Sequence, residues 1–154
     1  MLIDANVFIY AFTQRSDQCR FLLARCERDE IVGITTAEIV SEVCHRLMLI
    51  EAAEMGVIAR PSAADLRRRR AELQSLTRYW TLTSQIWNLN ISILPLNESR
   101  HRAAQRVRTE YGLLTNDSLI VAAAEEYDVK ALASRDDDFD QVRGLTVYKP
   151  TDLS

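Results

Sequence analysis

The sequence has few of the residues that build zinc sites and disulfide frameworks. Its 154 residues include three cysteines (Cys19, Cys26 and Cys44) and two histidines. The cysteines form no Cys-x-x-Cys pair, and neither His45 nor His101 stands at a zinc-ligand spacing from them. An odd number of thiols also argues against a disulfide framework, so we expect reduced, buried cysteines. Structural zinc domains and disulfide-rich secreted proteins are therefore disfavoured.

Membrane and export segments are also missing. No apolar run approaches the roughly 18 residues that suggest a membrane span. The first residues lack a basic region and carry Asp4 within their apolar run, which is not typical of a secretory signal. Because there is also no repeat, linker or low-complexity tract, we expect a single cytoplasmic domain over 1–154 with a substantial core.

Lysine is scarce, since 17 of the 19 basic residues are arginine. The net charge of −3 is unevenly spread: segment 60–110 has ten arginines and four acids, a balance of +6, which leaves −9 elsewhere. This split predicts an acidic site in one region and a basic surface in another. Arginine suits bidentate phosphate contacts, although a GC-rich genome would produce the same bias.

Short apolar runs alternate with amphipathic segments, which predicts an α/β fold. We expect strands at 1–4, 31–34, 91–94, 130–133 and 145–148. Asn6 would cap the first helix, and Thr36 a helix with apolar residues at helical spacing. A helix over 16–28 would place Phe21 on its apolar side. Strands separated by helices require crossovers, so the sheet should be mostly parallel and covered on both faces.

The central part of the chain contains an extended helical segment at about 60–90. Ser62 and Asp65 resemble a capping box at its start, and a break near 81–84 would divide it. Two further helices are expected, from Asn97 to Gly112 and over 116–127.

Four acids stand where the predicted topology could bring them together. They are Asp4 at the end of the first strand, Glu42 two turns into the helix after the second, Asp117 in the first turn of its helix, and Asp136 just past the fourth strand. Ligands of open parallel sheets bind outside the carboxyl ends of the strands. All four side chains can reach that edge.

Each acid also has an ordinary explanation. Asp4 could cap the first helix, and Glu42 could pair with Arg46 on a helix surface. Asp117 could simply favour a helix dipole, and Asp136 could belong to a solvated acidic loop. Only their expected position at one edge of the sheet indicates a common function for the four acids.

Clustered carboxylates favour a divalent metal site. At an effective dielectric of about 20, two like charges 4 Å apart repel by roughly 4 kcal/mol. Hard oxygen ligands select Mg²⁺, for which Mn²⁺ can substitute, and such ions accept phosphate oxygens as further ligands. The chemistry that fits best is phosphodiester hydrolysis by a metal-activated water.

These residues resemble the PIN domain family, and within it the VapC-type ribonuclease toxins of toxin–antitoxin pairs. The resemblance covers essentially the whole chain. It rests on Leu2-Ile3-Asp4-Ala5-Asn6, on Thr36 six residues before Glu42, on Asn116-Asp117-Ser118-Leu119-Ile120-Val121-Ala122-Ala123, and on Ser134-Arg135-Asp136-Asp137-Asp138-Phe139. Ala5 departs from the pattern, because many members have serine or threonine there, and the stretch of roughly 60–90 is longer than in compact members.

The resemblance implies a site, a sheet order and a function. Asp4, Glu42, Asp117 and Asp136 would be the catalytic metal ligands, with Asp138 as a further ligand. Asn6, Thr36 and Ser134 would hold these acids by hydrogen bonds. The sheet order would be 3-2-1-4-5. The protein would be a Mg²⁺-dependent endoribonuclease toxin that dimerises and binds a cognate antitoxin; the alternatives are a non-catalytic RNA- or protein-binding module and a housekeeping RNA-processing nuclease.

The basic segment offers candidates for positioning RNA along its phosphates. We expect these to be Arg67, Arg68, Arg70, Arg102 and Arg106, with Arg69, Arg100 and Arg108 as further candidates; a solvated helix surface is the plainer explanation of the run at 67–70. Trp80 and Trp87 could stack on bases, but core or interface packing is the more ordinary role for tryptophan.

Overall fold

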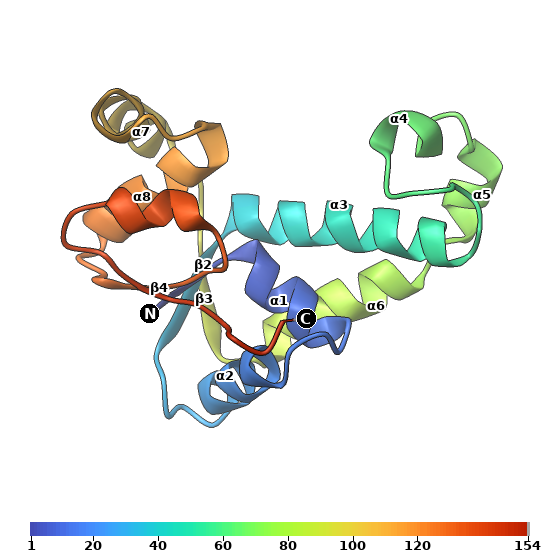
Figure 1. Cartoon of the computed structure of the whole chain (residues 1–154), viewed down its shortest axis with the longest axis horizontal. Helices are drawn as coiled ribbons and strands as arrows, with labels where there is room; N and C mark the ends of the chain where they lie inside the picture. Colours follow the sequence, from blue (N-terminus) through green and yellow to red (C-terminus); the bar gives the residue numbers. More distant parts are fainter. Residues whose placement is uncertain (154) are drawn as a thin grey trace.

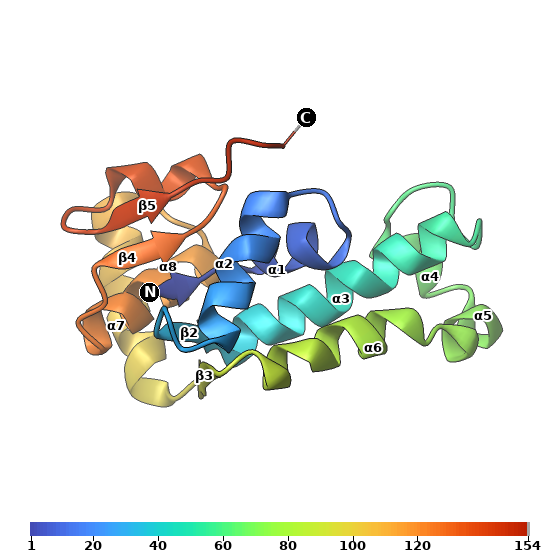
Figure 2. The ribbon, with the colours of Figure 1, turned by 90° about the horizontal axis from the view of Figure 1, so that it is seen from below.

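The computed structural model describes residues 1–153, in which a five-stranded parallel sheet has the order β3-β2-β1-β4-β5 (Figures 1 and 2). Its strands are β1 (Leu2–Ile3), β2 (Gly33–Thr36), β3 (Ile91–Leu94), β4 (Ala131–Ala133) and β5 (Thr146–Tyr148). The parallel sheet and the order 3-2-1-4-5 are confirmed. The first strand in the chain lies at the centre, so its end is flanked by the ends of both neighbours.

Helices and short 3₁₀ segments connect the strands. They are α1 (Ala5–Phe12), α2 (Asp17–Glu27), α3 (Ala37–Glu54), α4 (Ala63–Leu66), α5 (Arg70–Ser75), α6 (Arg78–Ser84), η1 (Gln85–Asn88), α7 (Glu98–Tyr111), α8 (Thr115–Glu126) and η2 (Asp137–Gln141). Figure 1 shows α7 and α8 on one side of the sheet and α2 on the other. No helix described in residues 1–153 is both long and apolar enough to cross a membrane.

One hydrophobic core joins the sheet to its helices. Leu2, Ile3 and Leu132 from the central strands are fully buried, as are Phe8 from α1 and Val43 from α3. Both faces of a parallel sheet must be covered, and the two central strands β1 and β4 are accordingly apolar throughout instead of alternating. Asp4 follows directly on this apolar strand and is therefore carried into the interior.

Several helix boundaries follow the local capping rules expected from the sequence. The side chains of Thr36, Ser62 and Asn97 accept hydrogen bonds from the backbone N–H groups three residues later. Gly112 ends α7 in the left-handed conformation, with φ of 67°. Such caps depend on a few neighbouring residues, which is why the sequence predicts them well.

Two local predictions are wrong. Asp4, and not Asn6, caps α1: Asp4 Oδ1 accepts from the N–H of Ala5, and the Asn6 amide turns towards Asp4 and Ser134 instead. Phe21 is 63% exposed, because the buried face of α2 is defined by Cys19, Leu23 and Cys26. These three recur at intervals of four and three residues, and Phe21 falls outside that stripe.

The helical segment at 62–88 breaks in different places from the one expected. Arg67 to Arg69 lie between α4 and α5 instead of on one helical turn, and Leu76 has extended backbone before α6 begins. Residues 81–84, where we expected a break, are instead the last four residues of α6. Within this helix the Thr83 hydroxyl donates to the carbonyl of Tyr79. The helices end where they do because the turns between them allow Leu66 and Leu76 to be buried in a second small core.

This second core lies at the far end of α3. It joins Ala52 on α3 to Ile58, Leu66 and Leu76 from the segment 55–77, which we call the α4–α5 arm. An 18-residue helix is about 27 Å long. The arm therefore lies a helix length away from the sheet, as Figures 1 and 2 show.

Candidate functional site

Asp4 lies at the carboxyl end of β1, in the middle of the sheet edge. Its N–H donates to the carbonyl of Ala133 (3.0 Å), which continues the pairing with β4 past the last strand residue. Oδ1 accepts from the N–H of Ala5 (2.6 Å), and Oδ2 accepts from the hydroxyl of Ser134 (2.6 Å). The residue is 7% exposed. The carboxylate is thus fixed in position and almost removed from water.

Asn6 and Ser134 build a hydrogen-bond network around Asp4. The Asn6 amide donates to Asp4 Oδ2 and to Ser134 Oγ (3.1 Å), while its Oδ1 accepts from the N–H of Arg135 (3.0 Å). Ser134 Oγ also accepts from the N–H of Asp136 (3.0 Å). This network ties the start of the chain to the loop after β4. Both residues therefore contact Asp4 directly.

Thr36 acts on the site in a different way. Its hydroxyl accepts from the N–H of Ile39 (3.3 Å) and so fixes where α3 begins. The neighbouring Thr35 donates its hydroxyl to the carbonyl of Ile3 (3.0 Å), across to β1. Thr36 thus sets the direction of α3, which carries Glu42, and contacts none of the four acids through a hydrogen bond in residues 1–153.

The electrostatics of Asp4 show that several negative charges meet here. Burial, with a smaller contribution from the charges of Glu42 and Asp117, raises the pKa of Asp4 to about 6 in spite of the opposing hydrogen bonds from Ser134 and Ala5. A carboxyl in contact with a compensating cation would have a lowered pKa instead. The negative charge at this edge of the sheet therefore lacks a compensating positive charge.

Asp117, in the first turn of α8, is in the same situation. Burial raises the pKa of its half-buried carboxyl, and the charges of Asp136, Asp138 and Glu42 raise it further, with Asp136 contributing more than Asp138. Asp136 is half-buried and caps η2, because its Oδ1 accepts from the N–H of Asp138 (3.0 Å). The five carboxylates therefore affect one another across one region.

Glu42 contributes its charge from α3. Its side chain is 31% exposed and pairs with Arg46 at 3.4 Å, so the ordinary helix-surface pair exists together with the proximity to Asp4 and Asp117. An exposed pair of this kind is worth at most about 1 kcal/mol. It leaves Glu42 free to turn towards a stronger cation.

The acids are gathered loosely. In residues 1–153, no three Asp, Glu, His or Cys side chains stand close enough to hold a metal ion as they are placed. Their donor chemistry nevertheless fits Mg²⁺ or Mn²⁺, because all are hard carboxylate oxygens and their charges act on one another. The residues present fit a divalent cation, around which the side chains of Glu42, Asp136 and Asp138 would have to close.

Glu38 is not among the residues that the sequence singles out, yet it lies one turn before Glu42 on α3. Both of its carboxylate oxygens are buried, and neither has a hydrogen-bond partner in the described chain. Its position four residues before Glu42 was the sequence signal that could have included Glu38 among the candidate residues. Its burial depends on packing from other elements, which no local pattern reveals.

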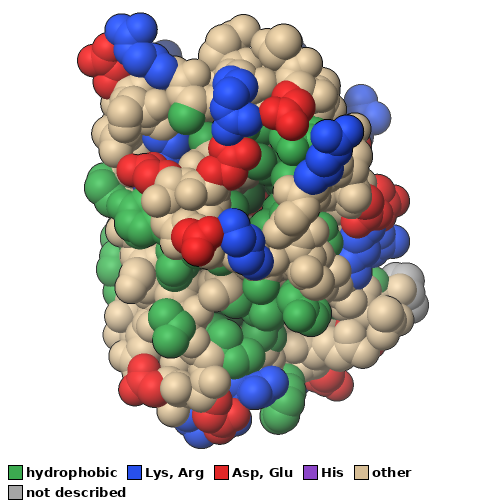
Figure 3. Space-filling view, turned by 90° about the vertical axis from the view of Figure 1, so that its left-hand side faces the viewer, with side chains coloured by type: hydrophobic (Ala, Val, Ile, Leu, Met, Phe, Trp, Pro, Cys, Tyr) green, Lys and Arg blue, Asp and Glu red, His purple; other side chains and the backbone are tan. Residues whose placement is uncertain are grey.

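The candidate RNA-binding arginines do not form one basic belt. Arg102 pairs with Glu98, and Arg106 pairs with Glu110 and Glu125. The face drawn in Figure 3 accordingly shows basic and acidic side chains side by side. Arg100 was a further candidate for contact with RNA, but its side chain is fully buried and bonded to Glu126 (2.8 Å), so that expectation is wrong.

The remaining candidates lie far from the acids. Arg67, Arg68 and Arg70 are exposed on the α4–α5 arm, and no acidic partner of theirs is found within residues 1–153. Glu42 is the sixth residue of α3, whereas the arm follows the last turn of this helix. Their separation from the acids approaches a helix length.

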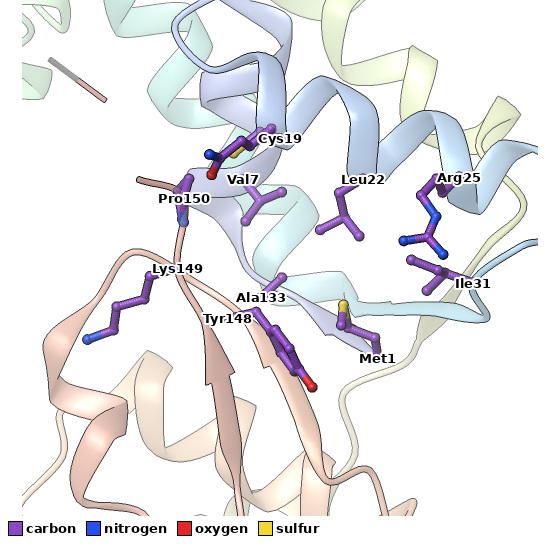
Figure 4. A pocket seen from close by; sticks show the side chains of 11 residues that line it. Met1, Val7, Cys19, Leu22, Arg25, Ile31, Ala133, Tyr148, Lys149 and Pro150 are labelled. Carbon is purple, nitrogen blue, oxygen red and sulfur yellow. The ribbon is translucent and has the colours of Figure 1, made fainter. Parts of the chain in front are cut away.

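A hollow elsewhere in the molecule has a different character. It has a volume of about 250 Å³, and apolar side chains such as Val7, Leu22 and Ile31 line it between α2 and the sheet (Figure 4). Tyr148 and Lys149 line the opposite side of this hollow. None of the four acids lines this hollow, so it is separate from the candidate site.

The chain is similar to known proteins over nearly its full length. The model of the PIN domain matches residues 1–145. Two relatives come from Methanocaldococcus jannaschii: Ribonuclease VapC6, 34% identical over 97% of this chain and 96% of the relative, and Ribonuclease VapC2, 25% identical over 97% and 93%.

Solved structures share the fold. One is VapBC2 from Rickettsia felis bound to a DNA fragment from its promoter (TM-score 0.61, 16% identity, 97% of each chain). Another is a toxin–antitoxin complex from Klebsiella pneumoniae (TM-score 0.57, 18% identity, 96% of this chain and 98% of that one). From the family model, the full-length relatives and the sheet topology, this chain belongs to the PIN domain family, among its VapC-type members.

Proposed function

We propose that this protein is a divalent-cation-dependent endoribonuclease and the toxin of a toxin–antitoxin pair. The observation that carries the proposal is Asp4, a buried carboxylate whose pKa rises to about 6 while the charges of Glu42 and Asp117 act on it. Carboxylates that the fold holds close together in spite of their mutual repulsion are typical of a site that binds a cation. The relatives named Ribonuclease VapC support the choice of RNA as substrate.

The residues have separable roles in this proposal. Asp4, Glu42, Asp117 and Asp136 would hold the cation, with Asp138 near enough to contribute charge. Asn6 and Ser134 keep Asp4 in place by donating to its Oδ2. A bound Mg²⁺ would lower the pKa of a coordinated water and offset negative charge on the phosphodiester. Thr36 would set the direction from which Glu42 approaches.

Partner proteins belong to the same proposal. The similar structures from Rickettsia felis and Klebsiella pneumoniae are toxin–antitoxin complexes, so we propose an antitoxin that covers the acids.

For the homodimer, the best-suited surface is the groove between α3 and α6. It is lined by Val40, Met48, Trp80 and Trp87, and the two tryptophans are 55% and 52% exposed. Interfaces are enriched in such aromatic residues. We place the protein in the cytoplasm, where free thiols such as its three cysteines persist.

The decisive experiment is cleavage of total RNA by the purified protein with Mn²⁺ and with a chelator. Asp117→Asn and Asp4→Ala should each lower the rate by at least a hundredfold, because each removes a charged oxygen that holds the cation. Asp65→Asn is the matched control, since Asp65 is exposed on α4, far from the sheet edge. Full activity in both site variants would refute the assignment.

The same assay separates the alternatives. A non-catalytic binding module would bind RNA or protein but cleave nothing with either metal. A housekeeping nuclease would cleave RNA yet leave growth unaffected when expressed alone. A toxin should arrest growth, and co-expression of a small DNA-binding partner encoded beside it should restore growth.

A further inference from the structure

Glu38 has a buried carboxylate that nothing in the fold explains. Both oxygens are inaccessible to solvent, and no donor in the described residues bonds to either. Buried polar atoms in native proteins almost always have a partner, so each exception needs a physical reason. A carboxylate without one is costly whether it is charged or protonated.

The ordinary roles of a helix-start glutamate are already filled by other residues. Thr36 caps α3, so Glu38 is not needed to satisfy the first N–H groups. Arg46, the basic residue nearest along the helix face, pairs with Glu42 and has no ion pair with Glu38. A favourable interaction with the helix dipole requires no burial. The burial itself is therefore the feature to explain.

The position of Glu38 relates it to the acid site. It lies in the first turn of α3, directly after the carboxyl end of β2. Residues four apart share one face of a helix, so Glu38 and Glu42 lie on the same face. The charge of Glu42 acts on both Asp4 and Asp117, so this face of α3 borders those two acids. Helical side chains also tilt towards the N-terminus, here towards the sheet edge.

We propose that Glu38 is a fifth acid of this site, a positioning residue whose carboxylate accepts hydrogen bonds from water carried by the cation. The inference rests on the proposed function. Mg²⁺ and Mn²⁺ bound by few carboxylates keep several of their waters, and these waters need acceptors. Two buried oxygens without donors provide such acceptors. Groups that orient a metal's surroundings typically affect its affinity by tenfold or more.

The test is a Mn²⁺ titration of the intact protein, with the free ion measured by electron paramagnetic resonance. Glu38→Gln should weaken Mn²⁺ binding by about tenfold or more, because it removes a negative charge and keeps the shape. Glu38→Leu should weaken it similarly, and Glu38→Asp should retain part of the affinity. Glu27→Gln is the control, since Glu27 is exposed on α2 and should leave the affinity within twofold.

Thermal unfolding in chelator shows whether the variants are folded. Glu38→Gln should be as stable as the parent protein without metal, because it keeps the shape of the side chain and breaks no hydrogen bond of the described chain. A merely structural role predicts the same result in chelator but an unchanged Mn²⁺ affinity. Affinity equal to the parent in both Glu38→Gln and Glu38→Leu would overturn the inference and leave the proposed function standing. Absence of Mn²⁺ binding and cleavage in the parent protein would overturn both.

Discussion

Buried carboxylates lie near both ends of α3, under opposite conditions. At the far end, Glu51 is 5% exposed and accepts hydrogen bonds from the N–H groups of Thr77, Arg78 and Tyr79 at the start of α6. Burial alone would raise its pKa, but these three donors hold the pKa below its usual value. At the sheet end, burial and neighbouring acids raise the pKa of Asp4 and Asp117.

The difference separates a structural carboxylate from one suited to function. Glu51 is satisfied by the fold itself and helps attach the α4–α5 arm to α3. The acids at the sheet end are placed by the fold but not neutralised by it, which is the arrangement that the proposed cation site requires. The predictions below test this contrast, from the largest expected effect to the smallest.

Glu51→Ala should lower the free energy of unfolding by about 4 kcal/mol, because three partly buried N–H groups lose their charged acceptor. Urea unfolding followed by tryptophan fluorescence measures this directly, since Trp80 lies in α6. Glu54→Ala is the control: Glu54 is exposed and pairs with Arg78 on the surface, so its loss should cost less than about 1 kcal/mol. Equal effects in the two variants would remove the contrast.

The pH dependence of Glu51 should follow from its lowered pKa. Its stabilisation is fully present above the unfolded pKa, for which the ordinary value is 4.5, and is lost as pH falls through the lower folded pKa. The stability difference between the parent and Glu51→Gln should therefore shrink in acid. A difference that persists unchanged at pH 2 would contradict this linkage.

Asp4→Asn should stabilise the metal-free protein, with the opposite pH dependence. The folded pKa of Asp4, about 6, lies above its ordinary 3.8, so the native state loses stability as pH rises between these values. A tenfold change in acidity is worth about 1.4 kcal/mol, so the gain at pH 7 approaches about 3 kcal/mol and disappears below pH 4. Urea unfolding in chelator at a series of pH values measures it, with Asp65→Asn as the control.

Ser134→Ala should reduce RNA cleavage about tenfold without unfolding the protein. The hydroxyl donates to Asp4 Oδ2 and accepts from the N–H of Asp136, so its loss frees two acids at once. Ser75→Ala removes a comparable but exposed hydroxyl on α5 and should leave the rate within twofold. A Ser134 variant with parental activity would mean that this network does not position Asp4 for catalysis.

The triple variant Arg67→Ala, Arg68→Ala, Arg70→Ala should show the smallest effect. These arginines lie on the α4–α5 arm, about a helix length from the four acids, so we expect cleavage within twofold of the parent. The salt dependence of RNA binding should also stay the same. A salt slope reduced by about three would instead place the arm on the RNA path, as the basic composition of segment 60–110 first suggested.

Local rules account for the features that the sequence predicts well. Thr36 and Gly112 begin or end helices through bonds within a few residues, and β3 has the bounds expected from its apolar run. The family resemblance supplied the sheet order and assigned roles to the four acids that the predicted topology had already singled out. The misplaced breaks in the segment 62–88 came from a second core, whose members Ala52, Leu66 and Leu76 have no pairing visible in sequence.

Burial is what the sequence could not supply. Glu38, Glu51 and Glu42 all lie on one amphipathic helix, and nothing in their neighbours distinguishes their environments. Only the tertiary fold shows that α6 supplies donors to Glu51 and that none reaches Glu38. Arg100 is similar, because its place in a basic helix predicted exposure, whereas packing between α7 and α8 buries it.

The bond between Ser134 and Asp4 has a consequence for biosynthesis. It joins positions 130 residues apart through the pairing of β1 with β4. Before β4 has been synthesised, Asp4 has only Ala5 and Asn6 as hydrogen-bond donors and lacks Ser134. Under the proposed function, a nascent chain could therefore not cleave RNA until β4 and the residues up to Asp136 have been added.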